Sequence, residues 1–103
     1  MRTLITGGLI ARADGVFNAD LLIEDEKILE LGERLHERAQ PDGTQIVDVS
    51  GCVVVPGGID AHTHVNLTVG GAHVSDGFEA GTLAAAWGGT TTIVEHPGFG
   101  PQG

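Results

Sequence analysis

The sequence predicts a mixed β and α/β fold, in which a β-rich segment over residues 1–52 precedes a strand–helix–strand unit over residues 53–103. The first observation is a series of short apolar or alternating runs before residue 50, separated by turn residues and without a helical period. The second is an apolar run, a helix-forming stretch and a β-branched run that follow one another after residue 53. At 103 residues, the chain is long enough for one small domain with a core but not for two.

The β-rich segment is expected to form a small antiparallel sheet with one buried face. Its strands are predicted at residues 3–6, 9–11, 19–24, 27–31 and 45–49. Turn signals separate them at residues 7–8, 13–15, 24–27 and 41–43. Residues 32–44 are mostly polar, and we expect a solvated connector with His36 at the surface, although residues 33–38 include good helix formers.

The central stretch is residues 53–64, Val-Val-Val-Pro-Gly-Gly-Ile-Asp-Ala-His-Thr-His. If residues 59–65 form a strand, the alternation of side chains places Asp60, His62 and His64 on one face. Two imidazoles on one face at a strand end can reach the same metal ion. A bare His-x-His pair is also typical of two solvated histidines, so the flanking sequence has to decide between these interpretations.

The residues after His64 predict a crossover back to a second parallel strand. Residues 65–74, which include His73, are expected to form an exposed loop. Asp76 and Glu79 have the spacing of a capping box for a helix that ends before Gly88-Gly89 and places Leu83 and Trp87 on one face. Residues 90–95 are β-branched and apolar, which is typical of a buried parallel strand. A right-handed βαβ unit would put the histidine pair at the carboxyl edge, where α/β folds hold their active sites.

Composition excludes several classes of function. A formal net charge of −9 argues against nucleic acid or an anionic membrane surface as a partner. No apolar run approaches the length of a transmembrane segment. A single cysteine, Cys52, excludes an internal disulfide and predicts a cytoplasmic protein; we expect it to be a small buried apolar residue and not a catalytic thiol.

Three motifs carry a resemblance to a known family. Residues 55–64, Val-Pro-Gly-Gly-Ile-Asp-Ala-His-Thr-His, resemble the opening of the metal site in the cyclic amidohydrolases. Residues 75–82 and 88–94 are similar to the dihydropyrimidinase and hydantoinase branch. The resemblance implies that residues 1–52 are the N-terminal portion of a small β-sandwich domain and that residues 53–103 are the first strand–helix–strand of a TIM-type (β/α)8 barrel.

The resemblance also implies a chemistry. His62 and His64 would ligate the more buried of two zinc ions, which a carboxylated lysine would bridge and two further histidines and an aspartate would complete. A metal-bound hydroxide would attack the ring carbonyl of a small cyclic amide or imide, and the aspartate would carry a proton to the leaving nitrogen. Asp60 is interpreted as a structural residue or one that supports the ligands by orienting an imidazole.

Two positions depart from the family pattern. Dihydroorotases have an arginine two residues after the second histidine and hydantoinases usually have an aspartate, whereas this chain has Asn66. Glu95-His96-Pro97 stands where an aspartate and an aromatic residue are expected. The resemblance therefore argues against a dihydroorotase and leaves open which cyclic amide or imide is the substrate.

The chain offers only part of such a site, because a (β/α)8 barrel takes about 250 residues. No lysine follows Lys27, so the bridging lysine is not in this sequence. The remaining candidate ligands are His73, Glu95 and His96, and we expect solvated roles for both histidines. The chain alone is therefore expected to bind zinc weakly and to be inactive. Residues 98–103 have the composition of a loop and are interpreted as a boundary.

Three hypotheses of different classes follow. The chain is the N-terminal piece of a cyclic amidohydrolase, which is the leading hypothesis, or one subunit of a split amidohydrolase, or a non-catalytic binding or scaffold module. The intact pair of His62 and His64 counts against the third. The strands expected after residue 53 have open edges, so the expected partners are the remainder of the barrel or other copies of the chain, as in a homo-oligomer.

Overall fold

The structure is a computed structural model that describes residues 1–38 and 40–97. Its contacts divide the chain into two units, Met1–Pro56 and Gly57–Gly103, and each is described by itself. The main secondary structure of the described chain is β-strand, in several small sheets, with one α-helix in the second unit. The division falls slightly later than the boundary expected after residue 52, because Val53–Val54 pairs with a strand of the first unit.

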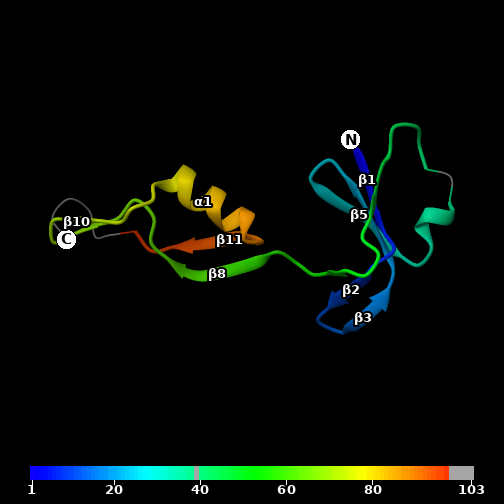
Figure 1. Ribbon diagram of the computed structural model, residues 1–103, viewed down its shortest axis with the longest axis horizontal. Coiled ribbons are helices and arrows are strands. Elements are labelled where there is room, and N and C mark those ends of the chain that lie inside the picture. Colours follow the sequence, from blue (N-terminus) through cyan, green and yellow to red (C-terminus); the bar gives the residue numbers. More distant parts are fainter. Residues whose placement is uncertain (39, 98–103) are drawn as a thin grey trace. The chain divides into compact units, whose positions relative to one another are not determined.

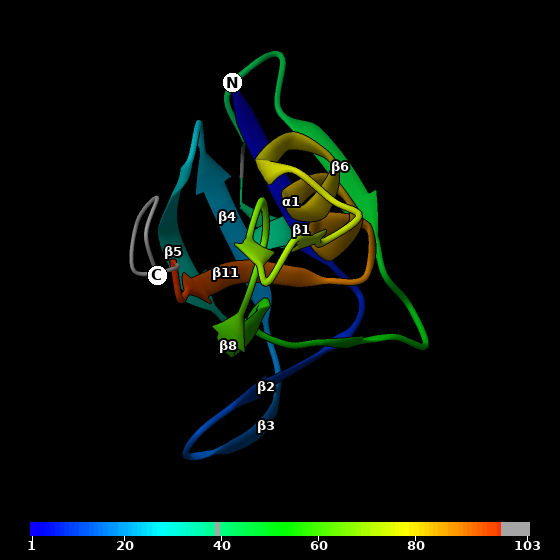
Figure 2. The same ribbon diagram turned by 90° about the vertical axis from the view of Figure 1, so that its left-hand side faces the viewer.

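The first unit is a set of short strands. They are β1 (Arg2–Thr6), β2 (Leu9–Arg12), β3 (Gly15–Asn18), β4 (Asp20–Glu24), β5 (Lys27–Gly32), β6 (Gln45–Asp48) and β7 (Val53–Val54), with the 3-10 helix η1 (Leu35–Glu37) after β5. Figure 2 shows β4 between β1 and β5, in a four-stranded sheet of order β5-β4-β1-β6. A three-stranded sheet has the order β3-β2-β7.

The prediction of a purely antiparallel sheet is wrong in two pairings. β6 pairs with β1 in parallel, and β7 pairs with β2 in parallel. Both strands come after the long connection that follows β5, and this connection brings the chain back to run in the same direction as its first two strands. The other pairings within the unit are antiparallel.

Strand β3 was not expected from the sequence. Gly15 and Asn18 at its ends are poor strand formers, so the sequence signal there is weak. The strand is held by antiparallel pairing with β2, in which Ile10 lies opposite Phe17. The guanidinium of Arg12 also lies over the ring of Phe17, 5.1 Å from its centroid.

The core of the first unit corrects the expectation of a solvated connector after β5. Leu4 of β1, Leu22 of β4 and Leu35 of η1 form one buried cluster, and Leu35 is 1% exposed. Its neighbour His36 is half-exposed, as a surface residue would be, but it is bonded to the buried carboxylate of Asp20. The segment is therefore a structural part of the unit, anchored by the buried side chain of Leu35.

Three apolar side chains of the first unit are exposed, two of them beside a bulge in β5. Leu22 lies opposite Glu30 and Ile23 opposite Ile28, so Leu29 is the extra residue of a bulge in β5. Ile28 and Leu29 are both exposed, which resolves the ambiguity of this strand's faces in the sequence. Cys52, which was expected to be buried, is exposed and free.

The second unit is a strand–hairpin–helix–strand arrangement (Figure 1). Its elements are β8 (Gly58–Thr63), β9 (Thr68–Val69), β10 (Ala72–His73), α1 (Phe78–Trp87) and β11 (Thr90–Glu95). The predicted parallel pairing of the two long strands, β8 and β11, is confirmed. The expected loop after His64 instead contains the hairpin β9–β10, because Gly70 and Gly71 adopt positive φ angles of 56° and 84°.

Helix α1 ends where the sequence predicted, with Gly88 as its C-cap and Gly89 at a φ of 85°. The predicted capping box is wrong, because the N-cap is Gly77 and no side chain caps the helix. The exposed side chains of Leu83 and Trp87 also show that the apolar face is not the packed one.

Apolar side chains of the parallel pair are exposed as well. Ile59 of β8 is 70% exposed and Val94 of β11 is 45% exposed, although both strands are apolar enough to be buried on both faces. The physical reason is that α1, the helix that packs on β11, covers one side of the pair. Within residues 1–38 and 40–97, no helix has the length and hydrophobicity required to cross a membrane. The interpretation of residues 98–103 as a loop lies outside the described residues.

Candidate metal centre

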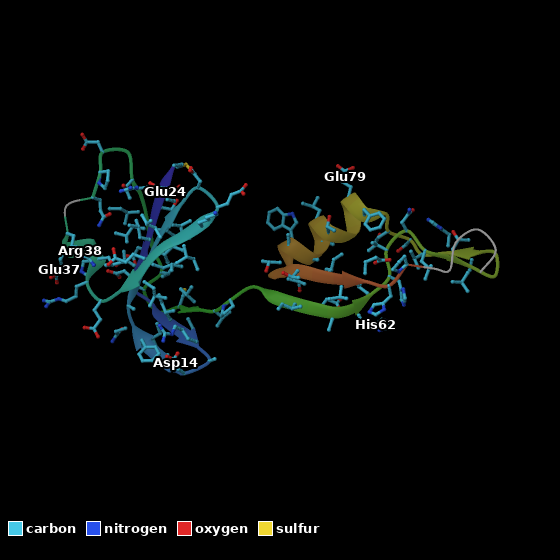
Figure 3. All side chains as sticks on the ribbon, turned by 180° about the vertical axis from the view of Figure 1, so that it is seen from behind. Asp14, Glu24, Glu37, Arg38, His62 and Glu79 are labelled. Carbon is cyan, nitrogen blue, oxygen red and sulfur yellow. The ribbon has the colours of Figure 1, made fainter. Side chains whose placement is uncertain are left out.

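The two predicted ligands lie at the carboxyl end of β8, where Figure 3 labels His62. His62 is the penultimate residue of the strand, and His64 follows its last residue, Thr63, which pairs with Glu95 at the end of β11. Both imidazoles are exposed to solvent. The parallel pairing therefore gathers the residues that follow both strands at one edge.

The imidazoles of His62 and His64 converge on one point. Their Nε2 atoms are 3.1 Å apart, their ring centroids are 5.0 Å apart and their planes cross at 78°. Two zinc–nitrogen bonds of about 2.0–2.1 Å that meet at a tetrahedral angle separate the two nitrogens by about 3.3 Å. The pair therefore fits two adjacent ligand positions of a single zinc ion.

The tautomer of His64 suits a metal ligand. Its Nδ1 lies 2.7 Å from the main-chain carbonyl oxygen of His96, which can only accept a hydrogen bond. In the neutral ring the proton is therefore on Nδ1, and Nε2 keeps a free lone pair toward His62. A ring N–H that is held by a carbonyl behind the ligating nitrogen is the usual support of metal-bound histidines.

His96 takes part in this cluster, although the sequence suggested a merely solvated histidine. Its ring stacks on that of His62, with centroids 3.9 Å apart and planes 14° from parallel. Its Nε2 lies 3.4 Å from the carbonyl oxygen of Ala61, and its main-chain N–H donates to the carbonyl of Thr63 at 3.0 Å. The side chain is exposed, but it packs against the candidate ligands.

Glu95 forms a hydrogen bond with the backbone that follows His64. Its Oε2 accepts a hydrogen bond from the main-chain N–H of Val65 at 3.0 Å. Val65 is 8% exposed and lines a pocket of about 220 Å³ together with Gly81 and Ala85 of α1. Glu95 therefore fixes the backbone beside the histidine pair.

Asp60 is close to the pair and contacts it through the main chain. Its Oδ1 accepts a hydrogen bond from the main-chain N–H of His62 at 3.1 Å. The ring Nδ1 of His64 is contacted by the carbonyl oxygen of His96, and not by Asp60. Asp60 and His64 both line the pocket beside α1.

His73 lies away from the cluster, in the hairpin β9–β10. Its Nδ1 is 2.7 Å from the hydroxyl of Thr68, the residue opposite it in the hairpin. Across the described part of the chain, no group of three or more His, Cys, Asp or Glu side chains is arranged to hold a metal ion. The candidate centre in these residues is thus a two-histidine chelate with a supporting third histidine.

The sequence held a signal for the contribution of His96. Both long strands were expected to be parallel, and Thr63 and Glu95 are partners in their register. The residue after each strand must then lie at the same edge, which places His64 beside His96. The exact stacking on His62 depends on side-chain packing, for which the sequence carries no such signal.

Comparison with known proteins places this geometry in context. No family model matches the chain. D-phenylhydantoinase of Escherichia coli O1:K1 is 48% identical over 103 residues, which are 100% of this chain and 22% of that protein. The chain therefore spans about a fifth of the length of the curated relatives it matches.

Solved structures agree with this similarity. A D-hydantoinase structure gives a TM-score of 0.82 at 45% identity, covering 92% of this chain and 20% of that one. The dihydropyrimidinase of Brevibacillus agri gives 0.82 at 41% identity, with the same coverage. The D-hydantoinase of a Thermus species gives 0.81 at 40% identity, covering 90% of this chain and 20% of that one.

The parallel strand pair, the histidines at its edge and these similarities define the class: the chain belongs to the cyclic amidohydrolase family. Within that family it corresponds to the N-terminal part of the D-hydantoinases and dihydropyrimidinases.

Proposed function

We propose that this chain supplies the opening part of a metal-dependent hydrolase that cleaves the C–N bond of a cyclic amide or imide. The observation that carries the proposal is the 3.1 Å separation of the Nε2 atoms of His62 and His64. The similarity to proteins named hydantoinase and dihydropyrimidinase supports it. In this proposal, residues 1–52 belong to a small β-sandwich, and residues 53–103 form the first strand–helix–strand of a (β/α)8 barrel.

The chain's own residues would act by binding and orientation. His62 and His64 would hold the more buried of two zinc ions through Nε2, and the carbonyl of His96 would keep the proton of His64 on Nδ1. When bound, the two zinc ions would supply a water activated near neutral pH. Asp60 would fix the main chain at His62, from which one imidazole projects.

The remaining ligands would come from other parts of the complete site. No lysine follows Lys27, so a bridging lysine is not among these residues. The proposed partners are therefore the remainder of a barrel, other copies of the chain in a homo-oligomer, and a small cyclic amide substrate. A remainder supplied as a separate polypeptide would make this chain one subunit of a split enzyme.

The test measures metal content and hydrolysis of dihydrouracil and hydantoin in the complete protein. His62→Ala and His64→Ala should each remove the buried zinc and lower hydrolysis by roughly a thousandfold, because each takes away one of the two nitrogens of the chelate. His73→Ala is the matched control and should retain both properties. Zinc retained at full occupancy in both ligand variants would disprove the metal site. Zinc binding without hydrolysis in the unaltered protein would favour a non-catalytic module.

A further inference from the structure

His96 contacts both candidate ligands, His62 through its ring and His64 through its main-chain carbonyl, although the residue at this position departs from the family pattern. We propose that His96 is a positioning residue that preforms the chelate of His62 and His64, with Glu95 as its support. The inference rests on the proposed function, because it assigns a role toward the metal pair named there.

The main chain of His96 fixes one imidazole. Its N–H donates to the carbonyl of Thr63 at 3.0 Å, which extends the parallel pairing of β8 and β11 by one residue. Its carbonyl oxygen lies 2.7 Å from Nδ1 of His64. The position of this acceptor therefore follows from the strand pairing, and it turns Nε2 of His64 toward His62.

The side chain of His96 fixes the other imidazole. Its ring lies parallel to the ring of His62 at a centroid distance of 3.9 Å, so it limits rotation of that ligand about its side-chain bonds. The ring of His96 is itself directed by the carbonyl of Ala61, 3.4 Å from its Nε2. With Nε2–H given to that carbonyl, His96 serves as a support and leaves the chelating positions to His62 and His64.

Glu95 holds the backbone on the far side of His64. Its carboxylate accepts the N–H of Val65 at 3.0 Å, and the side chain of Val65 is buried in the same unit. The backbone is therefore tied to β11 on both sides of His64, through the Thr63 carbonyl and the Val65 N–H. This explains why the Glu95-His96 pair can replace the aspartate and aromatic residue expected there: the glutamate bonds the backbone and the imidazole provides a flat stacking surface.

The test uses the 103-residue chain and a competition titration of Zn²⁺ against a chromophoric chelator. His96→Ala should weaken zinc binding roughly tenfold to a hundredfold, which is the usual effect of removing a residue that orients a ligand. His96→Phe keeps a flat ring against His62 and should retain most of the affinity. His73→Ala, which removes a histidine outside the cluster, should bind zinc as the unaltered chain does.

A second measurement separates positioning from general stability. Long-range ¹H–¹⁵N spectra of the zinc-free chain should show His64 with its proton on Nδ1 in both the unaltered chain and His96→Ala, because the acceptor is a main-chain carbonyl, and the β8–β11 amide signals should persist in both. Unchanged zinc affinity in His96→Ala would overturn the inference. An equal loss of zinc affinity in His96→Ala and His96→Phe, with the proton of His64 still on Nδ1, would also overturn it. If His62→Ala and His64→Ala leave zinc binding unchanged, the proposed metal pair itself is wrong; if they abolish it while His96→Ala has no effect, only the role of His96 fails.

Discussion

One carboxylate oxygen of Asp20 binds His36 twice: Oδ2 accepts the main-chain N–H of His36 at 3.0 Å and lies 2.7 Å from the ring Nδ1. The other oxygen accepts the hydroxyl of Thr6 at 2.7 Å. Burial acts to raise the pKa of Asp20, but the hydrogen bonds from Thr6 and His36 outweigh it, and its pKa lies below the ordinary value. The buried Asp20 thus joins β4 to β1 and to the helix η1.

This relationship predicts acid sensitivity of the first unit. A carboxyl whose pKa is lowered by folding contributes stability above its unfolded pKa of about 3.9, and this contribution disappears as the pH falls through the lower folded pKa. Asp20→Asn should lower the free energy of unfolding by about 1–3 kcal/mol at pH 7 and by less at pH 2. Urea unfolding, followed through amide signals of β1 and β4, measures the difference. Asp42→Asn, in an exposed turn, should keep the pH dependence of the unaltered chain; an equal effect of both substitutions would contradict the prediction.

Leu35 should be essential to the first unit. Leu35→Ala should destabilise the unit by about 2–5 kcal/mol, because it leaves a cavity against Leu4 and Leu22. Leu29→Ala, at the exposed bulge of β5, is the matched control and should change the free energy of unfolding by less than about 1 kcal/mol. Denaturant unfolding measures both, and similar effects of the two would show that η1 is a solvated connector after all.

Gly81 should be required by the packing of α1. A Cβ added there would lie 2.7 Å from a methyl carbon of Val65, so Gly81→Ala should destabilise the second unit despite a gain in helix propensity of roughly 1 kcal/mol. In a Val65→Ala background, where the nearest side-chain atoms are 3.7 Å away, the same substitution should become stabilising. Thermal unfolding followed by the fluorescence of Trp87 measures this double-mutant cycle. Additive effects would mean that the two residues are not in contact.

The exposed apolar side chains of α1 predict self-association of the 103-residue chain. Leu83 is 58% exposed and Trp87 is 85% exposed, on a helix whose half-buried Gly81 and Ala85 line the pocket beside β8. Contiguous apolar surface of this kind drives association in water. Sedimentation should show oligomers, and the double substitution Leu83→Ser with Trp87→Ser should shift them toward monomer. Glu79→Gln, a polar change on the same helix, should have no such effect. A folded, dispersed monomer of the unaltered chain would refute the prediction.

Asn66, two residues after the histidine pair, predicts the substrate preference of the complete protein. Asn66 adopts a positive φ of 54°, which asparagine tolerates well, and its main-chain N–H bonds to the carbonyl of Asp76 at 2.8 Å. A carboxylate on the substrate would find no guanidinium at this position. Hydrolysis of hydantoin and dihydrouracil should therefore be faster than that of dihydroorotate, compared as kcat/KM on one preparation. Faster turnover of dihydroorotate would refute this preference.

Several elements followed directly from the sequence because their signals are local. The β-branched run of residues 90–95 identified β11, and Gly88-Gly89 set the end of α1. The strand-to-helix-to-strand order was sufficient to predict a parallel pair, since a crossover returns the chain in the same direction. Alternation along β8 was sufficient to bring His62 and His64 together, with two residues on one face at the strand end.

Other features required contacts between distant segments, and only the tertiary structure decided them. The parallel return of β6 to β1, the burial of Leu35 and the packed face of α1 all depend on which surfaces meet after the chain turns back. The stacking of His96 on His62 joins residues far apart in the chain, and its geometry depends on the backbone bond between His96 and Thr63. A sequence pattern states the preference of each segment, whereas such contacts arise from the combined free energy of all the surfaces that pack together.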